Sequence, residues 1–368
     1  QELVPGGTGH GCGHNLLGAG ALAAALGVKH YLQATGKPGT VVLYGCPGEE
    51  GGAAKAFMAR ENLWRGLDAA LTWHPDECNE VATGSTNACI QLQYTFHGVA
   101  AHAAGCPERG RSALDAVELM NTGVQYLREH MDSRARIHYA ITDAGGRSPN
   151  VVQAKASVLY MVRSDKVKKA LELQARVDKI AEGAALMTET TCERKFIDGL
   201  AETIPNHALE AVLYRNFEQT GVPAYTQAEA EFAEKIAASY DAAGHLPGTG
   251  SEDSAYAAQV QTLLHGGAMN DVLLPLYQGE AFCPGSTDVG DVIWECPTAQ
   301  LHVAAWPNGC PGHSWQNVSC AKSDTGRKAA LYAGKVLCGA AIDLMESPEI
   351  LQTAQAEFRQ RTAAGYSC

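Results

Sequence analysis

The chain has 368 residues and a formal net charge of −12, with 46% hydrophobic and 18% charged residues. This composition is typical of a folded globular protein, and the length suggests about two domains. The negative charge disfavours nucleic acid or an anionic membrane surface as a partner. The sequence also lacks an apolar run of the roughly 18 residues that a membrane-spanning helix needs.

The twelve cysteines are spread along the chain without the dense spacing of a disulfide framework. Several lie within apolar patterns, where a reduced thiol behaves as a small hydrophobe. We therefore expect a reducing compartment, the cytoplasm. The sequence begins at Gln1 without a signal-peptide pattern, and we expect it to be a fragment that lacks upstream sequence.

The first part of the chain alternates helix and strand signals. A glycine-rich loop leads into an apolar helix at about residues 15–34, and the β-branched run at 40–44 predicts a buried strand. A helix at about 53–63 and a second buried strand at 69–73 follow. Apolar runs separated by helices predict a largely parallel sheet, in which sites form beyond the carboxyl ends of the strands.

The pattern changes near residue 88. The next elements are strands near 90–96, 137–142, 156–162 and 189–196, with helices near 112–130 and 166–185. Their order, β-α-β-β-α-β, is that of the ferredoxin-like unit. We expect residues 88–199 to form such an α+β domain, inserted into a larger domain made of residues 1–87 and 200–368.

After residue 200 the α/β pattern resumes. It contains a helix near 228–240, a strand at 298–304 and helices at about 321–345 and 348–362. The predicted fold class is therefore α/β. A mixed, largely parallel sheet flanked by helices carries the inserted α+β unit.

Residue types that bind metals gather at the predicted loops and strand ends. The segment His10-Gly11-Cys12-Gly13-His14 holds three potential ligands, and its glycines let the backbone fold tightly around an ion. On its own, the segment is equally compatible with a glycine-rich turn before a helix. A zinc finger is excluded, because no partnering Cys-x-x-Cys or His-x3-His pair occurs elsewhere in the sequence.

The adjacent acids Glu49 and Glu50 form a second candidate, between a predicted strand and two glycines. Adjacent acids often mark only a solvated helix start, where Glu is favourable. They can also divide their work, one binding metal while the other takes a proton from bound water. His74 ends the next predicted strand and by itself could be structural. The combination of these residues predicts a metal site.

Together these residues resemble a family of metallopeptidase-related amidohydrolases that includes aminoacylases, indole-acetyl-amino-acid hydrolases and p-aminobenzoyl-glutamate hydrolases. Five motifs stand in the family's order: GHGCGHN at 9–15, PGEEGG at 47–52, WHP at 73–75, GVAAHAA at 98–104 and PGHS at 311–314. The p-aminobenzoyl-glutamate hydrolase branch is the most similar, through CGHN at 12–15, GSTDVGD at 285–291 and HSWQ at 313–316. The resemblance covers nearly the whole chain.

The resemblance implies a dinuclear metal centre that hydrolyses an amide bond. The implied metal ligands are Cys12, His14, Glu50, His74 and His313, with the Cys12 thiolate shared between two divalent ions. The other implied roles are general base for Glu49, oxyanion stabilisation across a dimer for His102, and binding of the substrate carboxylate for Asn150 and Arg163. Manganese is favoured by the resemblance, and zinc is the alternative because a thiolate ligand suits it.

By the same resemblance, residues 88–199 would form a lid that also makes a homodimer or binds a homologous subunit. The implied substrate is p-aminobenzoyl-glutamate or a related N-acyl amino acid or dipeptide, whose carboxylate suits the fork of an Arg side chain. By the same resemblance, family members carry on the order of a hundred residues ahead of the Cys-Gly-His triplet. This length agrees with the expectation that the sequence is a fragment that lacks upstream residues.

Three alternatives stay open at this point. The first is a general dipeptidase or aminoacylase of the same family. The second is a thiol enzyme in which Cys12 works with His74 or His313. The third is a non-catalytic paralogue or subunit that retains the fold.

Overall fold

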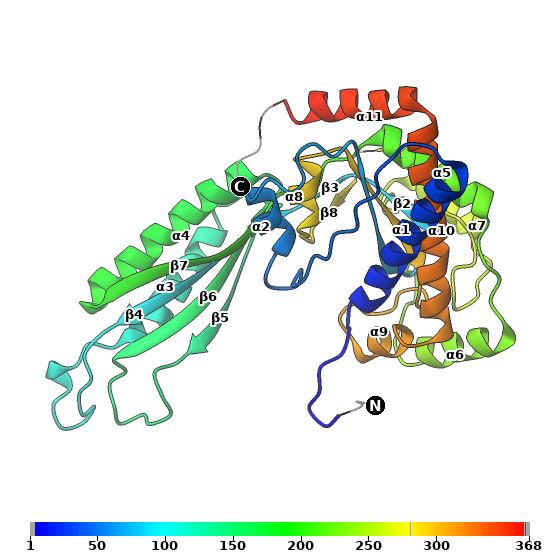
Figure 1. Ribbon diagram of the computed structural model, residues 1–368. Helices are drawn as coiled ribbons and strands as arrows, with labels where there is room; N and C mark the ends of the chain where they lie inside the picture. The colour runs from blue at the N-terminus through cyan, green and yellow to red at the C-terminus, as the bar shows by residue number, and fades with distance from the viewer. Residues whose placement is uncertain (1–3, 280, 364, 366–368) are drawn as a thin grey trace.

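The computed structural model describes residues 4–279, 281–363 and 365. Residues 1–3, 280, 364 and 366–368, which include both ends of the larger predicted domain, lie outside the described residues. Figure 1 shows a body that contains α1 and α10 and an extended arm that contains β4 to β7. None of the helices in the described ranges is long and apolar enough to cross a membrane.

The body is built on a small mixed sheet. The strands β1 (Ala70–Asp76) and β9 (Thr298–Ala304) pair in parallel, and β2 (Glu80–Ala82) pairs with β9 in the antiparallel sense. The strands β3 (Ser85–Thr86) and β8 (Phe282–Cys283) form a separate parallel pair. The predicted mixed α/β architecture is therefore confirmed.

Two long helices, α1 (His14–Thr35) and α10 (Asp324–Glu346), pack against each other beside the sheet. The buried residues of α1 recur every four positions, as expected for one helical face. Gly20 belongs to this face because a Cβ there would lie 2.6 Å from the ring nitrogen of Trp73. This close contact fixes the start of α1 next to β1.

Further helices complete the body. They are α2 (Ala54–Arg60), α5 (His207–Thr220), α6 (Gln227–Ala237), α7 (Ser254–Leu263), α8 (Val289–Ile293), α9 (Trp315–Cys320) and α11 (Pro348–Arg361). The main core of the body includes Trp73, Phe217 and Leu301.

The arm is an antiparallel sheet with two helices on one face (Figure 1). Its strands are β4 (Ala88–His97), β5 (Arg136–Asp143), β6 (Lys155–Ser164) and β7 (Thr191–Leu200), and its helices are α3 (Ala113–Arg128) and α4 (Val167–Thr188). The spatial strand order is β5-β6-β4-β7. The chain order of the elements is the predicted β-α-β-β-α-β. The arm has a hydrophobic core of its own.

Two sequence predictions are wrong. Residues 40–44 form no strand, and Val42 and Leu43 are about half exposed, at 51% and 47%. A β-branched run favours a strand, but a strand also needs a neighbour for its backbone hydrogen bonds, and no described segment pairs with this one. The helix predicted at 321–345 begins later, because the Ser323 side chain accepts a hydrogen bond from the Gly326 N–H and caps α10 there.

Candidate metal centre

Glycines let three distant segments meet at the start of α1. Gly13 precedes the helix with a left-handed backbone (φ 72°), and a Cβ there would lie 2.8 Å from the Pro75 ring. A Cβ at Gly11 would lie 3.2 Å from the Cα of His313. The loop that carries Cys12 therefore lies directly against the segments that carry His74 and His313.

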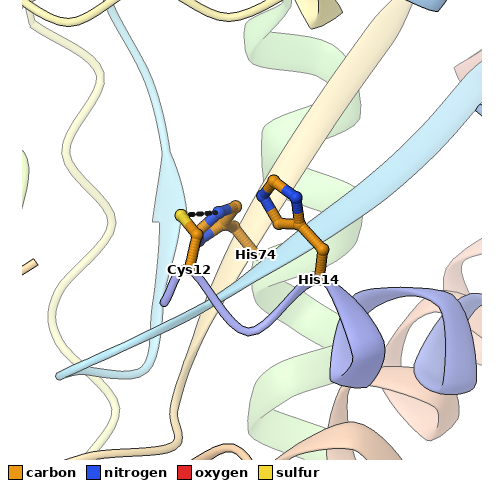
Figure 2. Close-up of side chains that lie close together, drawn as sticks. All are labelled: Cys12, His14 and His74. Atoms are coloured by element: carbon orange, nitrogen blue, oxygen red, sulfur yellow. Dashed lines mark hydrogen bonds between the residues drawn. The ribbon is translucent and has the colours of Figure 1, made fainter. Parts of the chain in front are cut away.

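The first group of potential ligands contains Cys12, His14 and His74. Figure 2 shows the three side chains turned toward one another, with Cys12 Sγ 3.4 Å from His74 Nε2. The ring centroids of His14 and His74 are 5.6 Å apart. One ligand atom from each residue lies within 4.8 Å of the other two, which is close enough for a single cation to bind all three.

Two more groups overlap the first. Cys12, Glu50 and His313 form one, and His14, Glu49 and Glu50 form the other, each within the same 4.8 Å limit. His313 Nε2 lies 3.3 Å from Glu50 Oε1, and His14 Nε2 lies 4.0 Å from the same oxygen. The structure thus brings together all five residues that the family resemblance implies as ligands, with Glu49 beside them.

The His74 ring is oriented as a metal ligand requires. Its Nδ1 lies 2.7 Å from the Pro75 carbonyl oxygen, which can only accept a hydrogen bond, so Nδ1 carries the proton. The lone pair is then on Nε2, the atom that faces Cys12. Burial and the neighbouring His302 lower the pKa of His74 to about 4, which keeps the ring neutral near pH 7.

The Cys12 thiol lies in an acidic environment. Burial and the charges of Glu50 and Glu49 raise its pKa to about 12. Within the described residues, the ion pairs of Glu50 are with histidines alone, and neither Lys nor Arg neutralises it. Thiol, imidazole and carboxylate donors without a neutralising side chain suit one or two divalent cations, so the residues fit a metal centre.

Glu49 is half-buried beside the group. Burial and the charge of Asp288 raise its pKa, while a hydrogen bond from the Thr287 hydroxyl acts in the opposite direction. A carboxylate with a raised pKa is a stronger base than an exposed one. Glu49 is therefore suited to accept a proton from a molecule held at the cluster.

His302 also lies beside the cluster, although it matches no motif and was not predicted from the sequence. The parallel register of β1 and β9 places it opposite His74, with ring centroids 6.3 Å apart. Its Nδ1 donates to Glu80 at 3.1 Å and lies 3.2 Å from an Asp76 oxygen. Burial lowers the pKa of His302, but the two carboxylates outweigh it and raise the pKa to about 9. The signal that could have revealed His302 is the alignment of two strands, which single motifs do not contain.

His102 and Asn150 do not join the cluster. They lie in two neighbouring loops of the arm, where the Ala103 N–H donates to the Asn150 carbonyl oxygen at 3.0 Å. These loops follow β4 and β5 at the free end of the arm, away from the start of α1 (Figure 1). Arg163 lies near the opposite end of β6, where its guanidinium donates to Ser286 Oγ at 3.2 Å.

Known proteins are similar to this chain in sequence and in fold. The model of peptidase family M20/M25/M40 matches residues 2–273. The chain is 44% identical over 369 residues to one subunit of the p-aminobenzoyl-glutamate hydrolase of Escherichia coli (strain K12), covering 98% of this chain and 76% of that protein. It is 27% identical over 362 residues to the Xaa-Arg dipeptidase of Homo sapiens, covering 97% and 71%.

A solved structure shares the fold. It is that of a candidate aminohydrolase from methicillin-resistant Staphylococcus aureus, with a TM-score of 0.52 at 14% identity, covering 81% of this chain and 65% of that one. The family model and the 44% identical hydrolase relative define the class of protein as a metal-dependent amide hydrolase. The family model spans well over half of the sequence, and the chain belongs to peptidase family M20/M25/M40. The resemblance inferred from the five motifs is thereby confirmed.

Proposed function

We propose that this chain hydrolyses the amide bond of p-aminobenzoyl-glutamate or of a closely related N-acyl amino acid. The 44% identity to one chain of a p-aminobenzoyl-glutamate hydrolase, over 98% of this sequence, supports this substrate class. The structural observation that carries the proposal is the shared position of Cys12. Its sulfur belongs both to the group with His14 and His74 and to the group with Glu50 and His313.

These five residues would hold two divalent cations, with manganese favoured and zinc as the alternative. When bound, the cations would supply positive charge that polarises the scissile carbonyl and lowers the pKa of the attacking water. Glu49 would take a proton from this water as its oxygen bonds to the carbonyl carbon. The same carboxyl would then give the proton to the amine nitrogen as the carbon–nitrogen bond breaks.

Residues 88–199 would act as a lid and dimerisation domain, and residues 1–87 and 200–368 as the catalytic domain. His102 Nδ1 accepts hydrogen bonds from the Ala104 and Gly105 N–H groups at 3.2 and 3.0 Å. Nε2 of the neutral ring therefore carries the proton and is free to donate to a developing oxyanion. Because its loop lies away from the cluster, His102 would serve the site of a partner subunit, and Asn150 beside it would contact the substrate.

The partner would be a second copy of this chain or a homologous subunit. Two different subunits of the Escherichia coli p-aminobenzoyl-glutamate hydrolase resemble this chain, at 44% and 28% identity. All eleven cysteines in the described ranges are free, which agrees with a reducing location such as the cytoplasm. A thiol-enzyme mechanism is disfavoured, because the raised pKa of Cys12 makes it a weak nucleophile without a cation.

A general dipeptidase is the second candidate function, favoured by the similarity to Xaa-Arg dipeptidase. Hydrolysis of p-aminobenzoyl-glutamate should be compared with that of a small dipeptide panel under identical metal loading. We expect the highest kcat/KM for p-aminobenzoyl-glutamate. A higher value for the dipeptides would favour the second function.

Removal of metal is expected to abolish hydrolysis. Dialysis against a chelator should reduce the rate to background, and added Mn²⁺ or Zn²⁺ should restore it, because the acidic ligand cluster needs the cations to activate water. Activity and metal content should be measured on the same samples. A rate that survives complete loss of metal would rule out the proposed mechanism.

Replacement of Arg163 with Lys is expected to weaken substrate binding. Lys keeps the charge but loses the planar fork that pairs with a carboxylate, so KM for p-aminobenzoyl-glutamate should rise about 10- to 100-fold with a smaller change in kcat. The matched control is a substrate whose glutamate α-carboxylate is replaced by an amide. Equal increases in KM for both substrates would mean that Arg163 does not bind the substrate carboxylate.

A further inference from the structure

Three consecutive residues, Ser286, Thr287 and Asp288, contact different parts of the molecule. Ser286 accepts a hydrogen bond from Arg163 of the arm, and Asp288 is bonded to Lys55 at the start of α2. We propose that this segment, the 286–288 strap, is a positioning element that fixes Glu49 relative to the ligand cluster. The inference rests on the proposed function, because it takes Glu49 as the general base.

Asp288 breaks a local rule of helix formation. It is the N-cap residue of α8, where an Asp side chain normally accepts a hydrogen bond from its own helix, yet it makes no such bond. Its two oxygens instead accept from the Lys55 backbone N–H at 3.1 Å and from Lys55 Nζ at 2.6 Å. The Asp288 side chain is fully buried. Departures from a local rule of this kind are expected at functional or strained sites.

The bonds to Lys55 constrain the turn that carries Glu49. The Gly48 carbonyl oxygen accepts hydrogen bonds from the N–H groups of Gly52 and Ala53 at 2.6 and 2.8 Å, so the turn is tight. Ala53 then enters α2 in a left-handed conformation (φ 46°) without a side-chain cap. A non-glycine residue keeps this conformation only where its surroundings enforce it. Asp288 provides this constraint through its hydrogen bonds with Lys55, the second residue of α2.

Thr287 connects the strap to Glu49 itself. Its hydroxyl oxygen accepts from the Val289 N–H at 3.4 Å, and the hydroxyl donates a hydrogen bond to the Glu49 carboxylate. The preceding residue, Ser286, connects the strap to the arm by accepting a hydrogen bond from Arg163. The strap therefore constrains the Glu49 side chain through Thr287 and the Glu49 backbone through Asp288.

The test uses two kinds of variant. Asp288→Asn keeps the shape but removes the charge that holds Lys55, and should lower kcat about 100-fold with little change in KM, because the base is displaced. Thr287→Val removes only the hydroxyl and should lower kcat about tenfold or more, whereas Thr287→Ser should keep kcat near that of the unaltered enzyme. Glu229→Gln, in the Lys328–Glu229 pair of the body, is the control for loss of a buried charge.

A second readout does not depend on turnover. In chelated protein, hydrogen exchange of the Lys55 amide should accelerate about tenfold or more in Asp288→Asn, and should be unchanged in Glu229→Gln. Metal content of the reloaded variants should equal that of the unaltered enzyme. If Asp288→Asn fails to fold, the kcat values of Thr287→Val and Thr287→Ser decide whether the strap positions Glu49.

The proposed role of the strap is overturned if Thr287→Val keeps full kcat. It is also overturned if a folded Asp288→Asn loses no more kcat than Glu229→Gln, or if its Lys55 amide exchanges no faster than in Glu229→Gln. These outcomes are distinct from failure of the proposed function. If Glu49→Gln is inactive while the strap variants are fully active, only the strap is wrong. If Glu49→Gln itself retains activity, the assignment of the base is wrong.

Discussion

Glu49→Gln is expected to lower kcat by about 10²- to 10⁴-fold while the protein keeps its metal. The amide has nearly the shape of the carboxylate, but it cannot take a proton from water. Glu49 lies beside the ligands, within 4.8 Å of His14 and Glu50, without belonging to either of the groups centred on Cys12. Its loss should therefore affect proton transfer rather than metal binding.

The neighbouring acid supplies the contrast. Glu50→Gln should lose bound metal as well as activity, because Glu50 shares one group with Cys12 and His313 and another with His14. Both variants should be assayed for kcat and for metal by elemental analysis. Loss of metal from Glu49→Gln and its retention in Glu50→Gln would mean that the two adjacent acids have exchanged roles.

Cys12→Ser is expected to have the largest effect on metal binding. Loss of a group that only orients a ligand costs about 10- to 100-fold in metal affinity, so removal of a ligand common to two ions should cost more than about 100-fold. A serine hydroxyl does not ionise as a thiol does and is a poor replacement at this position. Metal titration of the apo protein measures the effect.

The matched control is Cys192→Ser. Cys192 is also half-buried and has a raised pKa, but it lies on β7 of the arm. Its replacement should leave the metal affinity unchanged. If Cys12→Ser binds two ions as tightly as this control does, Cys12 is not the shared ligand.

Much of the fold could be predicted from the sequence where one periodic pattern dominates. The strand predicted at 298–304 has the bounds of β9, and the predicted helix at 15–34 differs from α1 by one residue at each end. Local hydrophobic period and glycine punctuation determine such elements. The segment 40–44 has an equally clear strand pattern but no neighbour among the described residues. Pairing depends on distant residues, so the pattern alone misleads there.

In the candidate site, too, local motifs could be predicted and contacts between distant segments could not. Cys12, His14 and Glu50 lie in short motifs whose residue types reveal a metal site, and the structure brings these residues together as expected. Strand register places His302 beside His74, and a contact between the starts of two helices joins Asp288 to Lys55. Asp288 stands in the GSTDVGD motif, but its contact with Lys55, like the pairing of His302 with His74, joins distant segments and cannot be read from a single motif.

The proposed mechanism depends on the Cys12 thiolate, which would be a ligand of two cations beside Glu49. Anomalous diffraction from crystals of the zinc-loaded protein tests this arrangement most directly. We expect two peaks of anomalous density, with Cys12 Sγ about 2.3 Å from each. Density at some other place, or two ions that Cys12 does not contact, would contradict it.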